Sequence, residues 1–314
     1  MPFIFDHLVL GTGSSDILDD GSFQTSDIVW IKGYAGADAI TSNGYANRVD
    51  GGRGNDTIYS NGGFIFGGDG DDIITGTGAF ERVHDGAGSD IIDLAANGFI
   101  AARGDGGNIY QGSLDPADIN ETVSYSRGSY GVTLWFLDDG NATAEYANTS
   151  DALIGIDRII TGSGNDQVLG HGASFLELRT RSGDDYIDVD VDTAIIHAGA
   201  GNDTVVLTGR DVEAEISVGT GIDRIFCGIG QETIAFRTGR EDRTEKAFTY
   251  VFDFESGPDK IKLQSRLSVS DFMALARDDT VSGISGVRFD AASGNTLFVV
   301  GFTADQLTAD DFIL

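Results

Sequence analysis

The sequence is constrained most by a tripeptide, Gly-x-Asp or a close variant, that returns at a nearly fixed interval. Its third residues stand 18, 16, 18 and 18 residues apart in a first series and 19, 18 and 20 apart in a second. A period near 18 is too short for a repeat built from paired helices and suits a narrow solenoid with two short strands per turn. The markers are Asp38, Asp56, Asp72, Asp90 and Asn108, then Asp166, Asp185, Asp203 and Asp223, with a weaker copy at Asp16.

An apolar residue stands two positions after each marker. Because strand side chains alternate between two faces, this is the inward position of a strand that begins at the marker. A second inward position is expected midway between markers. Each coil is therefore predicted to give one strand to each of two facing sheets. The first set is Leu18, Ile40, Ile58, Ile74, Ile92, Tyr110, Val168, Ile187, Val205 and Ile225, and the second is Val49, Ile65, Val83 and Ala101.

The charge of the chain limits its partners. The 314 residues include 50 acidic and 20 basic ones, for a formal net charge of −30. Such a chain repels nucleic acid and anionic lipid, and its self-repulsion opposes compaction unless cations bind. The one cysteine, Cys227, allows no intramolecular disulfide and is predicted to be a small buried hydrophobic residue.

The N-terminal stretch lacks the marks of a targeting segment. Residues 1–16 have no basic region, and Asp6 and His7 interrupt the apolar run, so a secretory signal peptide is not expected. This stretch is expected to form a first strand instead. No run of 18 apolar residues occurs, so no membrane span is expected.

Two of the repeats carry a family resemblance. "GGRGNDTIY" and "GGDGDDIIT", which begin at Gly51 and Gly67, resemble the nonapeptide G-G-x-G-x-D-x-U-x of RTX proteins, the hemolysin-type calcium-binding repeat family. Residues 121–170 resemble the spacer between repeat blocks of these proteins. "FDFESGPDKIKL" and "GNTLFVVGFTADQLTADDFIL" resemble their C-terminal region, which type I secretion systems read as an uncleaved export signal.

The resemblance implies an all-β fold: a right-handed parallel β-roll, or RTX β-solenoid, with two repeat blocks and a C-terminal β-rich cap that contains a short helix. The expected segments are an N-terminal strand and first block (1–120), a spacer (121–160), a second block (161–236) and a cap with the secretion signal (237–314). The charged stretch 237–246 is the best internal boundary.

Two local elements are expected within the cap. A helix should begin after Ser270 and place Phe272, Leu275 and Ala276 on one face. A hairpin should turn at residues 293–295.

The resemblance further implies several bound Ca²⁺ ions. Calcium takes 6 to 8 oxygen ligands from carboxylates and carbonyls, and glycines let a loop turn tightly toward the ion. Asn108 departs from the pattern, and Ser14 replaces a loop glycine before Asp16. The intervening turns keep glycine without aspartate, so calcium is expected along one edge of the first block, with plain turns along the other. The implied ligand loops carry Asp38, Asp56, Asp72, Asp90, Asp166, Asp185, Asp203 and Asp223, with Gly52, Gly54, Gly68 and Gly70.

One sheet face has a composition unlike the rest of the surface. The outward positions beside Val49, Ile65 and Val83 bring arginine, phenylalanine and histidine together. Arginines pair with carboxylates and rings stack on sugars, so this face is a candidate for binding an acidic glycan. The alternative is a solvated sheet face that packs against another part of the chain. The candidate residues are Arg48, Phe64, Phe66, Arg82 and His84.

No catalytic set is evident. The sequence has no G-x-S-x-G and no H-E-x-x-H, so it supports neither the lipase nor the metalloprotease branch of RTX proteins. The Tyr-Gly-x-Asp-Pro-His type of signature found in alginate epimerases is also absent. The four histidines, His7, His84, His171 and His197, are scattered and are expected to be structural.

Three functions remain open. The leading hypothesis is a secreted protein that folds on extracellular calcium, uses the type I secretion machinery and acts as a binding or surface-associating module. The second is an extracellular lyase or epimerase acting on an anionic polysaccharide. The third is an export and carrier segment whose relatives are fused to catalytic domains.

Overall fold

A computed structural model describes residues 5–21, 26–78, 81–95, 97–103, 106–113, 121–137, 141–146, 149–209, 212–237, 246–264 and 267–314. The chain divides into two compact units. Unit 1 contains residues 1–130 and 140–162, and unit 2 contains residues 131–139 and 163–314. Because this division cuts across residues 121–160, the four segments expected from the sequence stay a prediction.

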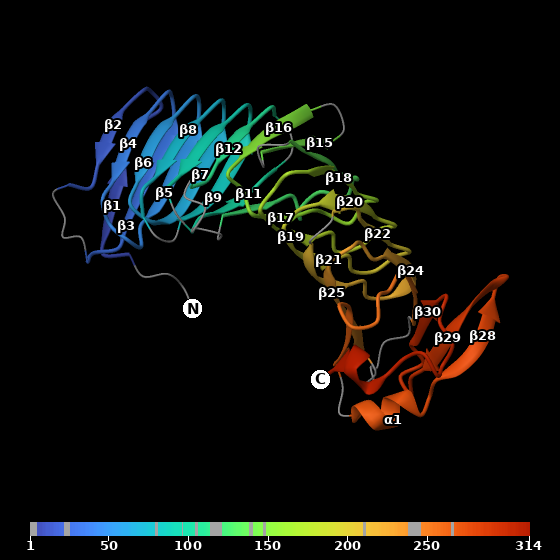
Figure 1. Cartoon of the computed structure of the whole chain (residues 1–314). Coiled ribbons are helices and arrows are strands. Elements are labelled where there is room, and N and C mark those ends of the chain that lie inside the picture. The colour runs from blue at the N-terminus through green and yellow to red at the C-terminus, as the bar shows by residue number, and fades with distance from the viewer. Residues whose placement is uncertain are drawn as a thin grey trace. The chain divides into compact units, whose positions relative to one another are not determined.

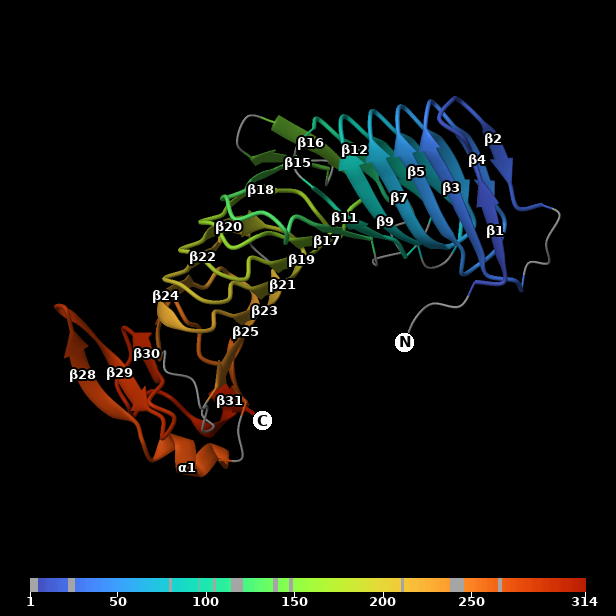
Figure 2. The ribbon, with the colours of Figure 1, turned by 180° about the vertical axis from the view of Figure 1, so that it is seen from behind.

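Unit 1 is a stack of coils, each with one strand in sheet A and one in sheet B (Figures 1 and 2). Neighbouring strands are parallel except β15 (Ala142–Tyr146), which runs antiparallel to β16. Sheet A has the order β1 (His7–Leu10), β3 (Val29–Ala35), β5 (Arg48–Arg53), β7 (Gly63–Asp69), β9 (Glu81–Ala87), β11 (Phe99–Ala101), β13 (Thr122–Ser124) and β17 (Arg158–Ile160). Sheet B has β2 (Ile17–Asp19), β4 (Ala39–Ser42), β6 (Thr57–Ser60), β8 (Ile73–Gly76), β10 (Ile91–Leu94), β12 (Ile109–Gln111) and β16 (Thr149–Ile154).

Unit 2 repeats this plan of one strand per sheet in each coil and ends in an antiparallel extension of β28 and β29. Its sheet A contains β19 (Phe175–Arg179), β21 (Thr193–His197), β23 (Glu213–Ser217), β25 (Gln231–Arg237), β27 (Lys260–Gln264) and β31 (Phe312–Ile313). Its sheet B contains β14 (Thr133–Phe136), β18 (Gln167–His171), β20 (Tyr186–Asp190), β22 (Thr204–Leu207), β24 (Gly221–Phe226), β26 (Ala247–Phe252), β30 (Thr296–Val300), β29 (Ile284–Asp290) and β28 (Arg277–Val281). Two short helices complete it, α1 (Val269–Met273) and the 3-10 helix η1 (Ala309–Asp311).

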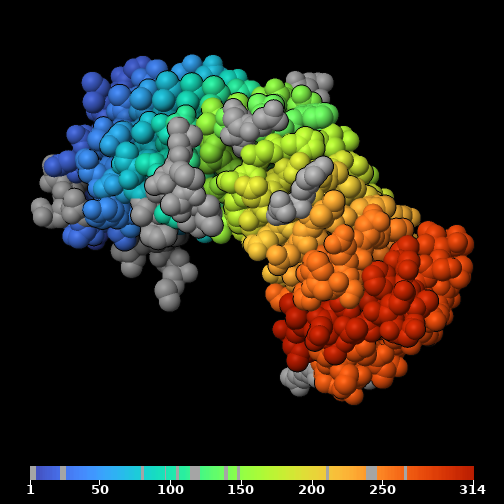
Figure 3. Space-filling view, viewed as in Figure 1, coloured from blue at the N-terminus to red at the C-terminus, as the bar shows by residue number. Residues whose placement is uncertain are grey.

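The predicted fold class is confirmed: the protein is all-β and forms a parallel β-solenoid. All ten residues predicted two positions after a marker are buried, from Leu18 to Ile225, and within each unit they stack in register. The interior is thin, because the second inward position of sheet B carries Ser42, Ser60 and Gly76 before Leu94 fills it. In space-filling view the coils of each unit nevertheless pack closely side by side (Figure 3).

One inward residue was predicted wrongly. Ile100, not Ala101, pairs with Val83 and is buried, whereas Ala101 pairs with His84 on the outward face. The spacing of this coil is 17 residues on the sheet A side, so counting 18 from Val83 shifts the register by one. A shift of one residue exchanges the two faces of a strand.

The cap contains the predicted hairpin and helix, but the helix begins earlier than expected. Its N-cap is Ser268, whose hydroxyl accepts a hydrogen bond from the Asp271 amide at 3.1 Å, so Leu275 and Ala276 lie beyond its end. Phe272 is fully buried and stacks on Phe289 at 4.8 Å. The hairpin of β29 and β30 turns at residues 291–295, as predicted. Most of the charged stretch 237–246 lies outside the described residues.

Glycines permit the close approach of successive coils in unit 1. Gly68 has φ +122°, and a Cβ added there would lie 2.0 Å from the carbonyl oxygen of Gly52. A Cβ added to Gly52 would likewise meet the carbonyl oxygen of Tyr34, and one added to Gly86 would meet that of Gly68. Gly54, Gly70 and Gly88 each approach the backbone of the preceding coil in the same way. The loop glycines predicted from the sequence are therefore required by backbone geometry alone.

We expect Gly68→Ala to destabilise unit 1 more than Gly283→Ala destabilises unit 2. Gly283 also has a positive φ, +84°, but no atom lies within 4 Å of its added Cβ. Both variants carry a left-handed strain of about 1–2 kcal/mol, and only Gly68→Ala must also push two coils apart. Chemical denaturation of each variant measures the difference. Equal losses of stability would contradict the packing argument.

Candidate metal-binding edge

A ladder of marker aspartates runs along the loops that lead from sheet A to sheet B, here called the aspartate edge. From Asp38 to Asn108, and again from Asp185 to Asp223, the Oδ1 atom of each marker accepts a hydrogen bond from the backbone amide of the marker one coil earlier. In unit 1 the bonds accepted by Asp56, Asp72 and Asp90 are each 2.8 Å long. In unit 2 those accepted by Asp185, Asp203 and Asp223 are 2.8, 3.1 and 3.1 Å. Every rung thus fixes one carboxylate oxygen.

On several coils the second carboxylate oxygen has no donor among the described residues. The Oδ2 atoms of Asp38, Asp56, Asp72, Asp203 and Asp223 are buried and accept no hydrogen bond from the described residues. An unpaired carboxylate oxygen removed from water is costly unless a cation or a donor reaches it. The structure therefore leaves one buried acceptor open on these coils.

Backbone carbonyls converge on the same places. The Oδ2 of Asp38 and the carbonyl oxygen of Gly51 both lie within 2.5 Å of the point where a Cβ on Gly33 would stand. The Oδ2 of Asp56 and the Gly67 carbonyl have the same relation to Gly51. Because the glycines have no side chain, these oxygens face a common space, which the Cβ of any other residue would fill.

Burial also raises the pKa of these carboxyl groups. The pKa of Asp56 is raised to about 6, and those of Asp72 and Asp223 to about 7, mainly by desolvation. For Asp203 the value is about 8, because Asp185 and Asp223 add their charges to the effect of burial. The pKa of Asp185 is raised to about 7, again by burial first. A bound cation would instead favour the charged form of each carboxyl group and so lower its pKa.

The donor set fits calcium. It consists of carboxylate and carbonyl oxygens, the ligands that this hard cation takes, and it contains neither sulfur nor nitrogen. The chain would hold ions through the open oxygens of the aspartate edge. The ligand roles assigned to the eight aspartates and to Gly52, Gly54, Gly68 and Gly70 stay predictions.

The ends of the ladder are closed by the protein itself. Asp16 accepts hydrogen bonds from the Thr12 amide and hydroxyl, at 2.6 and 2.8 Å. At the other end of unit 1, Asn108 replaces aspartate, and its backbone N–H donates to Asp151 Oδ1 at 2.8 Å. The Oδ2 of Asp151 accepts hydrogen bonds from Tyr125 and Tyr146, at 2.9 and 2.7 Å.

Asp151 is a rung that sequence reasoning missed. It follows Asn108 by 43 residues along the chain, yet β12 and β16 pair directly, and Asp151 immediately precedes Ala152, the partner of Ile109. The only available signal was the serine-aspartate step before an apolar alternation in residues 150–154. Tyrosine hydroxyls occupy the place where Asp38, Asp56 and Asp72 leave an oxygen open.

The opposite edge, formed by the loops from sheet B to sheet A, is not made of plain glycine turns alone. Buried Asp20 accepts hydrogen bonds from the Asn43 amide and from Asn47 Nδ2. Glu81 is also buried, and its Oε1 accepts from the Gly78 amide at 2.5 Å. In unit 1 these turns are thus held by side chains in the loops and at the start of the following strand.

The predicted glycan face lies on one side of sheet A in unit 1, as expected. Arg48, Phe64 and Arg82 pair in register, and Phe66 pairs with His84. The groups also contact one another: the Arg48 guanidinium lies 4.5 Å from the Phe66 ring, which stacks on His84 at 4.8 Å. Burial, followed by the charges of three arginines, lowers the pKa of His84. Several side chains of this face thus contact one another, and its role in binding a glycan stays a prediction.

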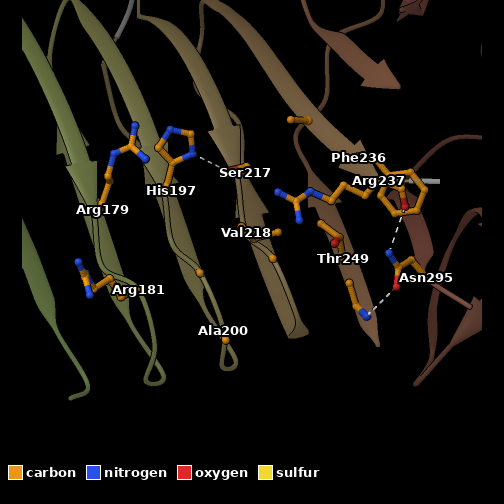
Figure 4. Close-up of a pocket in the computed structure, with 14 residues that line it drawn as sticks. Arg179, Arg181, His197, Ala200, Ser217, Val218, Phe236, Arg237, Thr249 and Asn295 are labelled. Carbon is orange, nitrogen blue, oxygen red and sulfur yellow. Dashed lines mark hydrogen bonds between the residues drawn. The ribbon is translucent and has the colours of Figure 1, made fainter. Parts of the chain in front are cut away.

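A basic hollow of about 390 Å³ lies on unit 2 (Figure 4). It is lined by Arg179, Arg181, His197, Ser217 and Arg237, together with Phe236, Asn295 and smaller residues. His197 Nδ1 lies 2.7 Å from the Ser217 hydroxyl, and burial together with Arg179 lowers the pKa of His197. The hollow therefore gathers positive charge on a chain of net charge −30.

The three arginines of this hollow differ in the partners that their guanidinium groups have within the protein. Arg179 donates to Glu177 through Nε and Nη2, at 3.0 and 2.8 Å, and Arg237 Nε donates to Gln264. The exposed side chain of Arg181 makes no hydrogen bond or ion pair with the described residues, and its φ of +67° is rare for arginine. Arg181 is the best placed of the three to meet a ligand.

Comparisons with known proteins place the chain in no family. No family model matches the sequence, and no curated protein matches it. Among solved structures, the extracellular lipase LipA from Serratia marcescens matches over 94% of this chain and 42% of its own, with 15% identity and a TM-score of 0.29. The chain thus spans about two fifths of that lipase, and similarity at this level carries no information on activity. Among the described residues, no helix is long and apolar enough to cross a membrane.

Without calcium, the folded fraction is expected to fall as the pH rises from about 5 to about 8. The folded carboxyls have pKa values of about 6 to 8 against an ordinary value of 3.8, so the folded chain binds more protons in this window. Their protonation stabilises the fold at low pH, and that stabilisation is lost as each group ionises. Far-ultraviolet circular dichroism in calcium-free buffers measures the effect. A calcium-free chain that gains structure on going to pH 8 would contradict it.

Proposed function

We propose that the protein is a secreted, calcium-binding β-roll of the RTX type that folds when it meets extracellular calcium. The observation that carries this proposal is the row of buried, unpartnered aspartate oxygens along one edge. The glycine-rich nonapeptides at Gly51 and Gly67 support it, because those glycines leave the space that the open oxygens face.

The proposed export route follows from the same charges. In cytoplasm with little free calcium, the carboxylates are not neutralised, so the chain stays extended and suits passage through a type I secretion channel. Extracellular calcium modules bind at about 10⁻⁴–10⁻³ M, so external calcium then drives folding. The folded chain acts as a binding or surface-associating module.

At pH 8 the chain is expected to be largely unfolded without calcium and to gain β-structure as calcium is added. Asp72→Asn keeps the Oδ1 acceptor for the Asp56 amide but loses the charge at the open oxygen. At saturating calcium this variant should melt roughly 4–8 °C below the parent, for a lost charged ligand worth about 2 kcal/mol.

Asp69→Asn is the matched control. Asp69 is exposed and pairs only weakly with Arg53, at 3.8 Å, so its replacement should leave the melting temperature unchanged. Circular dichroism with a calcium titration measures both variants. A chain equally folded without calcium, or an Asp72→Asn variant that melts with the parent, would refute the proposal.

A second candidate function is the binding of an acidic glycan at the basic hollow of unit 2. The convergence of Arg179, Arg181, His197 and Arg237 on a strongly acidic chain favours it. Arginine binds carboxylates through paired hydrogen bonds, and the surrounding negative charge would reject ligands that cannot make them. The predicted sheet face of unit 1 is the competing location for this function, and a lyase or epimerase activity would use the same bound polymer.

Arg181→Gln is expected to weaken binding of an oligouronate by about tenfold, because one charged hydrogen-bonding group is lost. Calorimetric titration of the calcium-loaded chain measures the affinity, and Arg53→Gln, an exposed arginine of unit 1, should leave it unchanged. Loss of binding in Arg82→Gln instead would place the site on the sheet face of unit 1. Absence of binding in the parent would remove this candidate.

A further inference from the structure

Three side chains with metal-binding atoms meet at the opposite edge of unit 2. Cys227 follows β24, Glu232 is the second residue of β25, and Asp259 directly precedes β27. The Cys227 Sγ and one carboxylate oxygen from each acid all lie within 4.8 Å of one another, and all three residues are buried. This edge carries the loops from sheet B to sheet A, so the cluster is separate from the aspartate edge.

Two of these residues are held in place by the backbone. The Glu232 amide donates to Asp259 Oδ1 at 3.1 Å, and the Glu255 amide donates to Asp259 Oδ2 at 2.7 Å. The position of Asp259 is therefore fixed by the register of β25 and by its own loop. Cys227 is fixed by its amide, which donates to the Phe252 carbonyl at 3.1 Å.

Glu232 is the feature that points to a ligand. Its exposed fraction is 0%, and neither Oε1 nor Oε2 accepts a hydrogen bond from the described residues. The amides of Gly228 and Glu232 favour its charged form but do not reach hydrogen-bonding geometry. A fully buried carboxylate facing a second carboxylate needs a proton or a cation between them.

Further negative groups lie around the cluster. Burial, followed by Asp259, raises the pKa of Glu232 to about 8. Burial, followed by the charges of Asp259, Glu232, Asp253 and Glu255, raises the pKa of the Cys227 thiol. Several negative groups therefore surround the cluster.

We propose that Cys227, Glu232 and Asp259 form a binding site for a zinc-like divalent cation. Thiolate sulfur is a ligand for zinc and its neighbours, whereas calcium takes oxygen ligands alone. Two carboxylates and one thiolate provide three ligands, and a carbonyl or water completes a tetrahedral set. The site ties β24, β25 and the start of β27 together, and it gives the single cysteine a role beyond packing.

The test uses the full chain, saturated with calcium and kept reduced. Cobalt(II) is added first, because a cobalt–thiolate bond gives a charge-transfer absorption in the near ultraviolet that carboxylates do not give. Zinc affinity is then measured in competition with a chromophoric chelator. The parent chain is expected to show the thiolate band and to bind one equivalent of zinc that displaces the cobalt.

Variants locate the site. Cys227→Ser and Glu232→Gln should each weaken zinc binding by about tenfold or more, and Cys227→Ser should remove the thiolate band. Asp72→Asn, on the aspartate edge of unit 1, should change neither. A parent chain without the thiolate band, or zinc binding insensitive to both variants, would overturn the proposal. Because the parent measurement needs no substitution, it stands even if a variant folds poorly.

Discussion

A carboxylate oxygen that is buried without a donor is the interaction on which the rest of the structure depends. On successive coils the marker aspartate uses one oxygen to join its neighbour and turns the other into a space lined by carbonyls. The interior offers little to offset the cost, because Ser42, Ser60 and Gly76 occupy inward positions where larger side chains would pack. A fold with so thin a core and so many buried carboxyl groups needs a proton or a cation at the open oxygens.

Unit 1 also contains a coil whose carboxylate is satisfied by the protein's own donors and needs no cation. At Asp151 two tyrosine hydroxyls supply the donors, and the neighbouring coil carries Tyr110 in place of an aliphatic residue. The Tyr110 hydroxyl in turn donates to Asp85 at 2.7 Å. The end of the ladder thus combines a larger core residue with a fully satisfied carboxylate. In unit 1 the open oxygens of Asp38, Asp56 and Asp72 lie on coils whose second inward residues are Ser42, Ser60 and Gly76.

Sequence reasoning could predict the parts of the fold that depend on a short period. The inward positions from Leu18 to Ile225 follow from alternation within strands and a repeat near 18, and all are buried. The register of Ile100 could not be predicted, because one coil is a residue shorter. Asp151 was hidden by the inserted strands, and the cluster of Cys227, Glu232 and Asp259 was hidden because its members come from three separate segments with no common motif.

The central claim is that cations occupy the aspartate edge. A crystal structure of the calcium-saturated chain, with anomalous scattering used to locate the ions, tests it most directly. The account predicts calcium between successive coils, beside the Oδ2 atoms of Asp38, Asp56 and Asp72 and the carbonyls of Gly51 and Gly67. Folded coils whose Oδ2 atoms contact neither calcium nor any other cation would contradict it.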